Sequence, residues 1–222
     1  EFIPVAEECG LICDLGNWVL RHACFEAARH LPGLVASVNV SPAQLVRSDF
    51  VAAVEAALEG SGLPAQRLEL EITESLFMDA APVALANLHG LKRLGVRIAL
   101  DDFGTGYSSL AYLRRFPFDS LKIDRAFVRE LSERGDARAI VRTIVQLART
   151  LGMSTIAEGV EEPAQLEVLH YAGCEAMQGF LAARPMPVAA LVGTLRDWRS
   201  GSRPPVTEAL PDTVYAALPS LR

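Results

Sequence analysis

Residues 97–106 read Arg-Ile-Ala-Leu-Asp-Asp-Phe-Gly-Thr-Gly, and this stretch decides the fold that we predict for the chain. The apolar run Ile98–Leu100 is typical of a short buried strand, and it ends in Asp101 and Asp102 before a glycine-rich turn. Two adjacent carboxylates repel each other and lose hydration when they are buried, and a bound cation offsets both effects. The stretch therefore predicts a buried strand that ends at a cation-binding or catalytic position.

The same pattern recurs along the chain. Five other short apolar segments run into a polar residue: Val35–Val38 before Asn39, Leu68–Leu70 before Glu71, Leu121 before Lys122, Thr155–Ala157 before Glu158, and Ala176–Met177 before Gln178. Segments with helical periodicity separate most of them, and in the clearest, residues 136–151, we expect Ile140 to face inward. Alternating strands and helices predict βαβ units. We therefore expect an α/β fold, a TIM-like (β/α) barrel whose site lies at the C-terminal ends of the strands.

The number of predicted strands sets the expected domain organisation. This sequence supplies about six strands and opens on a helical segment, whereas a closed barrel of this type has eight strands. We expect the first strands to lie upstream, unless another segment fills the gap. Residues 1–199 are predicted to form the incomplete barrel domain. Four prolines and a glycine punctuate residues 200–222, for which we expect an irregular C-terminal tail.

Composition narrows the class of protein. The 222 residues are 50% hydrophobic with few aromatic residues, which suits one α/β domain. A net charge of −6 without a stripe of Lys or Arg argues against nucleic acid as a partner. We find no apolar run of membrane-spanning length and no secretory signal, so we expect a cytoplasmic location, although a parent protein could be membrane-anchored.

The polar residues that follow the predicted strands suggest metal chemistry. Five of them offer oxygen ligands, namely Asn39, Glu71, Asp101, Asp102 and Glu158. Oxygen ligands without His or Cys favour Mg²⁺ or Mn²⁺. Asp101 could bridge two ions about 3.5–4 Å apart, as two-metal phosphodiester hydrolysis requires. Lys122 would then orient the attacking water or offset phosphate charge, and Glu158 is either a ligand or the general base.

A strand-end lysine also allows a second chemistry. Lys122 could form a Schiff base, as in aldolase-type barrels. The neighbouring Asp124 and Arg125 suit a charged lysine better than the desolvated amine that a Schiff base needs. We therefore rank this alternative well below metal-assisted hydrolysis.

Taken together, these motifs resemble the EAL-domain cyclic-di-GMP phosphodiesterases. The matching stretches are residues 2–12, 38–41, 69–75, 101–109, 121–125, 156–161 and 178–180, and the resemblance extends to about Trp198. It implies hydrolysis of cyclic di-GMP to linear 5′-pGpG in bacterial second-messenger signalling, with Mg²⁺ or Mn²⁺ in a two-metal site.

The resemblance also assigns roles to individual residues. It implies metal ligation by Asn39, Glu71, Asp101, Asp102 and Glu158, and catalytic roles for Lys122, Glu158 and Asp102. It places Gln178 near the substrate phosphate. It further implies a regulatory loop that couples the metal site to dimerisation, formed by Glu74, Phe103, Gly104, Thr105 and Gly106.

The family's signature Glu-Ala-Leu strand lies upstream of the segment that corresponds to Phe2–Pro4. That strand carries a further metal-binding glutamate and is followed by a substrate-binding arginine. We expect these to lie in a longer parent protein, a homodimer fused to or regulated by upstream sensory or diguanylate-cyclase domains. The alternative is a catalytically inactive cyclic-di-GMP-binding regulatory module, and release of pGpG in the presence of Mg²⁺ separates the two.

Overall fold

The computed structural model describes residues 2–74, 82–104, 113, 116–132 and 135–199. The chain divides into two compact units, Glu1–Leu121 and Lys122–Arg222. Within the described ranges, no helix combines the length and the apolar character needed to cross a membrane. The tail predicted for residues 200–222 lies outside the described residues, so the predicted boundary at residue 199 stays a prediction.

In the described residues six strands form the sheet, and all six predicted strands are confirmed. They are β1 (Ala36–Val40), β2 (Leu68–Thr73), β3 (Arg97–Phe103), β4 (Ser120–Ile123), β5 (Ser154–Ala157) and β6 (Ala176–Met177). Neighbouring strands follow the order of the sequence from β1 to β6, and β4 contributes to both units because the boundary falls within it. The pairs β1–β2, β2–β3 and β5–β6 are parallel. The α/β class is confirmed, with the sequential strand order of a TIM-like barrel.

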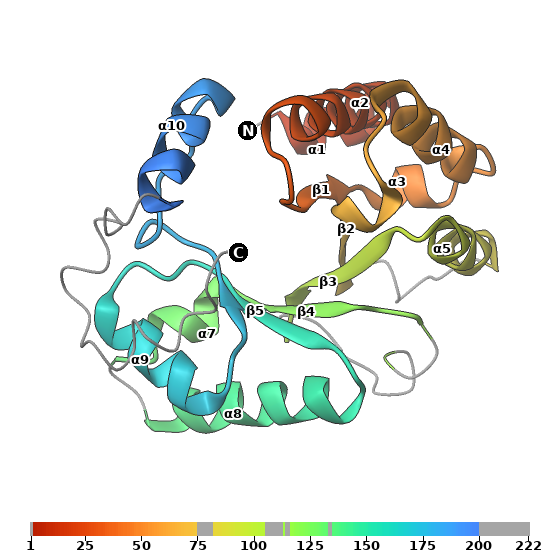
Figure 1. Ribbon diagram of the computed structural model, residues 1–222. Coiled ribbons are helices and arrows are strands. Elements are labelled where there is room, and N and C mark those ends of the chain that lie inside the picture. The colour runs from red at the N-terminus through yellow and green to blue at the C-terminus, as the bar shows by residue number, and fades with distance from the viewer. Residues whose placement is uncertain (1, 75–81, 105–112, 114–115, 133–134, 200–222) are drawn as a thin grey trace. The chain divides into compact units, whose positions relative to one another are not determined.

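Helices accompany the strands in each unit (Figure 1). The first unit contains α1 (Ile3–Glu8), α2 (Ile12–His30), α3 (Pro42–Leu45), α4 (Phe50–Ser61), the 3₁₀ turn η1 (Ala65–Arg67) and α5 (Pro82–Leu94). The second contains α7 (Arg125–Arg129), α8 (Gly135–Thr150), α9 (Pro163–Ala172) and α10 (Val188–Arg199). Helix α8 matches the predicted segment 136–151, but Ile140 is 42% exposed rather than turned inward. The buried face of α8 is formed by Ala137, Val141, Ile144, Val145 and Ala148.

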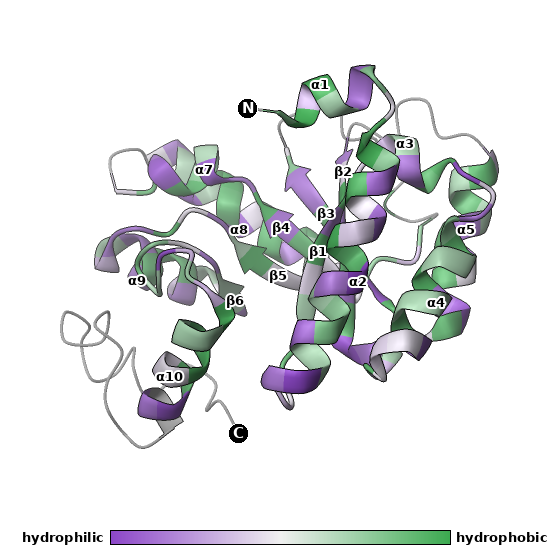
Figure 2. Ribbon diagram, turned by 90° about the horizontal axis from the view of Figure 1, so that it is seen from above, coloured by the Kyte–Doolittle hydropathy of each residue, from purple (hydrophilic) through white to green (hydrophobic). Residues whose placement is uncertain are grey.

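The strands of the first unit have one apolar and one polar face, because side chains alternate along a strand. Leu68, Leu70 and Ile72 of β2 are almost completely buried, and helices α2 and α5 pack against β1 and β3. The intervening positions of β2 hold Glu69 and Glu71, which are also buried. Colouring by hydropathy shows the hydrophilic end of β3 (Figure 2). Buried carboxylates therefore lie on the polar face, whereas the helices pack against the apolar face.

A close contact fixes the segment that follows Asn39. Helix α3 begins with a capping box in which Ser41 and Gln44 bond each other's backbone N–H groups. Gln44 is buried against Gly16 of α2, where an added Cβ would lie 2.2 Å from its side-chain atoms. A side chain at position 16 would displace the Gln44 amide, so Gly16 leaves room for the group that caps α3.

Candidate metal and catalytic site

Asn39 and Glu71 lie side by side on the polar face of the first unit. They are register partners on the parallel strands β1 and β2, so their side chains project from the same face. Glu71 is 6% exposed, whereas Asn39 is open to solvent. Both residues lie within their strands, since β1 continues to Val40 and β2 to Thr73. The sequence placed them directly after the strands, but the strands extend two residues further in β1 and three residues further in β2.

Asp101 belongs to the same face of the sheet. Its register partner is Thr73 of β2, and Ala99, two residues earlier on β3, is the partner of Glu71. Asp101 is therefore on the same face as Glu71 and two residues nearer to the C-terminal ends of the strands. Its side chain is buried, with 7% of the residue exposed. The first unit thus brings three of the predicted ligands, Asn39, Glu71 and Asp101, onto one face.

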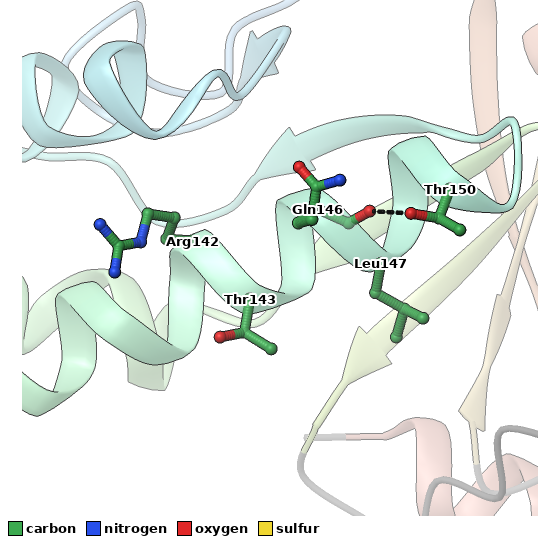
Figure 3. Close-up of a pocket in the computed structure, with 5 residues that line it drawn as sticks. All are labelled: Arg142, Thr143, Gln146, Leu147 and Thr150. Atoms are coloured by element: carbon green, nitrogen blue, oxygen red, sulfur yellow. Dashed lines mark hydrogen bonds between the residues drawn. The ribbon is translucent and has the colours of Figure 1, made fainter.

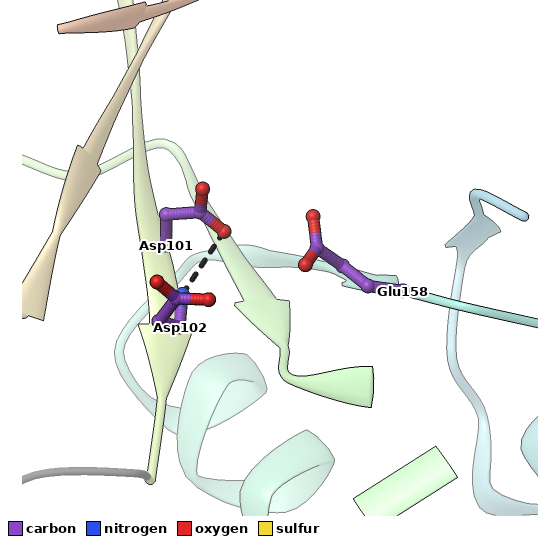
Figure 4. A group of neighbouring side chains, drawn as sticks. All are labelled: Asp101, Asp102 and Glu158. Atoms are coloured by element: carbon purple, nitrogen blue, oxygen red, sulfur yellow. Dashed lines mark hydrogen bonds between the residues drawn. The ribbon is translucent and has the colours of Figure 1, made fainter. Parts of the chain in front are cut away.

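Asp102 has an unusual backbone conformation. Among the described residues it is the non-glycine residue with a positive φ, 54°, and its N–H donates to Asp101 Oδ1 over 2.9 Å (Figure 4). Consecutive residues in a regular strand point to opposite faces, and the left-handed conformation interrupts this alternation. The ligand atoms of the two carboxylates lie within 4.8 Å of each other. Strain of this kind, about 1–2 kcal/mol, persists where the surroundings impose it, often at functional sites.

The turn after β3 is tied to the end of β2. The N–H of Gly104 donates to Glu74 Oε2 over 3.1 Å, and Glu74 is 8% exposed. Phe103, the last residue of β3, is buried. Glu74 and Gly104 were expected to act together, and this contact connects them. Thr105 and Gly106, the other predicted loop residues, lie outside the described residues.

In the second unit, Lys122 and Glu158 form an ion pair. Lys122 Nζ lies 2.5 Å from Glu158 Oε1, and the two side chains are 3% and 17% exposed. The N–H of Glu158 also donates to the carbonyl of Ile123, which ties the end of β4 to the residue that follows β5. Lys122 lies within β4, whereas Glu158 follows β5 directly as predicted (Figure 4). A buried cation is thus held by a carboxylate that remains partly open to solvent.

Gln178 follows β6 and is held by backbone bonds to the end of β5. Its N–H donates to the carbonyl of Ala157, and its own carbonyl accepts the N–H of Val160. The next residue is Gly179, where an added Cβ would lie 2.1 Å from the carbonyl oxygen of Val160. The side chain of Gln178 is exposed. The turn therefore holds the predicted substrate-binding residue next to the segment after Glu158.

A hollow on the outer surface of α8 is a separate feature. It is lined by Arg142, Thr143, Gln146, Leu147 and Thr150, and the Thr150 hydroxyl donates to the Gln146 carbonyl (Figure 3). None of its lining residues is a carboxylate or one of the predicted site residues. We therefore do not assign the metal chemistry to it.

The donor set suits a hard divalent cation. The predicted ligands supply carboxylate and amide oxygens from the ends of β1, β2, β3 and β5, without His or Cys among them. Mg²⁺, Mn²⁺ and Ca²⁺ prefer such ligands. Sequence reasoning missed Glu69, a buried carboxylate on the polar face. Its signal was the alternation Leu-Glu-Leu-Glu over residues 68–71, which places two carboxylates on one side of a strand.

Comparison with known proteins gives one consistent result. The family model of the EAL domain matches residues 1–185. The bifunctional diguanylate cyclase/cyclic di-GMP phosphodiesterase MucR of Pseudomonas aeruginosa is 46% identical over 199 residues, which are 88% of this chain and 29% of MucR. Cyclic di-GMP phosphodiesterase NbdA of the same species is 44% identical over 210 residues, covering 93% of this chain and 27% of NbdA. The chain spans between 24% and 31% of the length of the curated relatives that it matches.

Solved structures agree with the sequence matches. The PaMucR phosphodiesterase in complex with c-di-GMP is 46% identical with a TM-score of 0.81, covering 86% of this chain and 78% of that one. The manganese/cy-diGMP complex of Klebsiella pneumoniae BlrP1 at pH 6 is 31% identical with a TM-score of 0.73, covering 78% of this chain and 44% of that one. The likeness to both extends over most of the present chain.

Proposed function

The chain belongs to the EAL domain family, and from that premise we propose that it forms part of an enzyme that hydrolyses cyclic di-GMP to linear 5′-pGpG with divalent metal ions. One observation carries the proposal beyond family membership. Asn39, Glu71 and Asp101 lie on one face of the sheet, toward the C-terminal ends of their strands. This is where (β/α) barrels place catalytic groups. Relatives named as cyclic di-GMP phosphodiesterases supply the substrate class.

The oxygen ligands divide between the two units. We assign Asn39, Glu71, Asp101 and Asp102 of the first unit to metal binding, and Glu158 of the second unit either to the same metals or to the attacking water as general base. BlrP1 complexes with manganese and with calcium support a divalent cation, and we expect Mg²⁺ or Mn²⁺ in a two-metal site. Such ions, when bound, stabilise charge on the phosphate and lower the pKa of the attacking water.

Lys122 has an electrostatic role in this proposal. Its ammonium group is almost fully buried and paired with Glu158, so it can orient a water or offset phosphate charge at this point. The same pairing argues against the Schiff-base alternative, because a carboxylate partner stabilises the charged amine and a Schiff base needs the neutral one. Gln178, exposed after β6, would contact the substrate phosphate.

We extend the proposal to regulation and partners by analogy with the family. The contact between Glu74 and Gly104 supports a coupling between the turn after β3 and the metal ligands, and we propose that it responds to homodimerisation. MucR is named as a bifunctional cyclase and phosphodiesterase and is much longer than this chain. We propose that this chain likewise acts in the cytoplasm beside sensory or diguanylate-cyclase domains.

A metal-dependent activity assay tests the proposal. The purified protein is stripped with a chelator, and cyclic di-GMP and pGpG are then separated by chromatography with and without added Mg²⁺ or Mn²⁺. We expect pGpG only with metal, and its loss in Asp101→Asn and Glu71→Gln. Asp49→Asn is the matched control, because Asp49 is exposed at the start of α4. Binding of cyclic di-GMP without turnover at ample metal would instead indicate a non-catalytic regulatory module.

A further inference from the structure

Glu69 is a buried carboxylate that the proposed chemistry does not use. It lies on β2 with only 4% of the residue exposed. The hydroxyl of Ser37 on β1 donates to its Oε1 over 3.2 Å, and the hydroxyl of Ser120 on β4 donates to its Oε2 over 3.0 Å. Arg97 Nε on β3 lies 3.5 Å from Oε2. One carboxylate on β2 thus contacts side chains of β1, β3 and β4.

These four residues lie nearer to the N-terminal ends of their strands than the proposed site residues do. Glu69 is the register partner of both Ser37 and Arg97. Two residues further along β1, β2 and β4 come Asn39, Glu71 and Lys122, which is a rise of about 6.6 Å along each strand.

We propose that Glu69 is a positioning residue, which sets the lateral spacing of the strand ends that carry the metal ligands. The inference rests on the proposed function, because it concerns the same metal site. A metal site tolerates little displacement of its oxygen ligands, and partners behind the ligands commonly determine their placement. Both serine hydroxyls and Arg97 converge on Glu69, so its loss releases several strands at once, whereas the loss of one serine releases one.

Direct Mn²⁺ binding tests the inference without using turnover. Free Mn²⁺ is followed by electron paramagnetic resonance during titration of the purified protein, its Glu69→Ala and Glu69→Gln variants, and a control. We expect Glu69→Ala to raise the dissociation constant for Mn²⁺ about tenfold or more. Glutamine keeps the size of Glu69 and can bond both serines, since a hydroxyl can donate or accept. We therefore expect Glu69→Gln to recover most of the lost affinity.

Asn87→Ala is the matched control for a purely structural loss. Asn87 is equally buried, on α5, and its Nδ2 donates to the carbonyls of Leu45 and Arg47 over 2.7 and 2.6 Å. Its loss should lower stability while leaving the Mn²⁺ affinity within about twofold of that of the unsubstituted protein, because its hydrogen bonds run to Leu45 and Arg47, which are not on a ligand-bearing strand. If Glu69→Ala does not fold, the Ser37→Ala/Ser120→Ala double variant releases β1 and β4 from Glu69 and retains the carboxylate with its contact to Arg97.

The possible outcomes separate this inference from the proposed function. If the unsubstituted protein binds no Mn²⁺, both the positioning role and the proposed function are overturned. Normal Mn²⁺ binding that Glu69→Ala leaves unchanged, or weakens no more than Asn87→Ala does, would overturn the positioning role alone. Equal losses in Glu69→Ala and Glu69→Gln would assign the effect to charge and would also overturn it. In turnover assays at a fixed metal concentration, we expect Glu69→Ala to lower kcat and to leave KM for cyclic di-GMP unchanged.

Discussion

Gly179→Ala should disrupt the turn that carries Gln178. The added methyl group would lie 2.1 Å from the carbonyl oxygen and 2.4 Å from the nitrogen of Val160. These are backbone atoms, so no side-chain rotation relieves the clash. The carbonyl of Val160 accepts the N–H of Leu181, and its N–H donates to the carbonyl of Gln178. Any shift of Val160 therefore weakens both hydrogen bonds.

The expected loss of stability follows from these contacts. Overpacking typically costs about 1–3 kcal/mol, and each weakened hydrogen bond about 0.5–1.5 kcal/mol. Allowing for partial relaxation, we expect Gly179→Ala to lose about 2–4 kcal/mol in the free energy of unfolding, or roughly 5–15 °C in Tm. Affinity for cyclic di-GMP should fall as well, because Gln178 moves with the turn. Urea and thermal unfolding and calorimetric titration with the nucleotide measure these effects.

Gly193→Ala in α10 provides the matched control. Apart from the backbone of α10 itself, no atom lies within 4 Å of an added Cβ there, and alanine is favoured over glycine in a helix by up to about 1 kcal/mol. We therefore expect unchanged or higher stability and normal nucleotide affinity. If Gly179→Ala matches Gly193→Ala in both measurements, the close approach at Val160 does not constrain this turn and the reasoning is refuted.

Three further predictions concern Asp102, the ion pair and the cysteines. Asp102→Asn should keep near-normal stability, because Asn tolerates a positive φ, whereas Asp102→Ala should lose about 1 kcal/mol; both should weaken Mn²⁺ binding, and equal stabilities would contradict the strain argument. Lys122→Ala should lower kcat at least about 100-fold with bound metal retained, and near-normal kcat would exclude its electrostatic role beside Glu158. At pH 7.5, iodoacetamide should label exposed Cys9 but not Cys24, because burial raises the pKa of the Cys24 thiol to about 11 and keeps it protonated; mass spectrometry would reveal early labelling of Cys24, which would contradict this.

The strands were predictable from the sequence, but the exact place of the polar residues was not. Short, mostly apolar segments such as Leu68–Leu70 marked each strand, because the polar residue that follows such a segment can be recognised from the local sequence. The end of a strand, however, depends on where its paired neighbours end. The pairing of Asn39 with Glu71 joins residues far apart in the sequence, so the local pattern does not show it. The helix at residues 136–151 shows the same limit. Its period was clear, yet packing against α9 and β5 turned Val141 and Val145 inward instead of Ile140.

The composition of β2 shows why fold and site were predictable to different degrees. Strands of a parallel sheet covered on both faces usually read as continuous apolar runs, whereas residues 68–71 alternate Leu-Glu-Leu-Glu. Alternation normally indicates a face open to water, yet Glu69 and Glu71 are only 4% and 6% exposed. Burying a carboxylate is unfavourable unless partners compensate for its lost hydration. The two serines and Arg97 compensate Glu69 within the protein, and we assign part of that compensation at Glu71 to a metal ion. The sequence shows that both carboxylates occupy one face, but only the structure shows which partners Glu69 meets, and on this difference we base the proposal that Glu69 is structural while Glu71 binds metal.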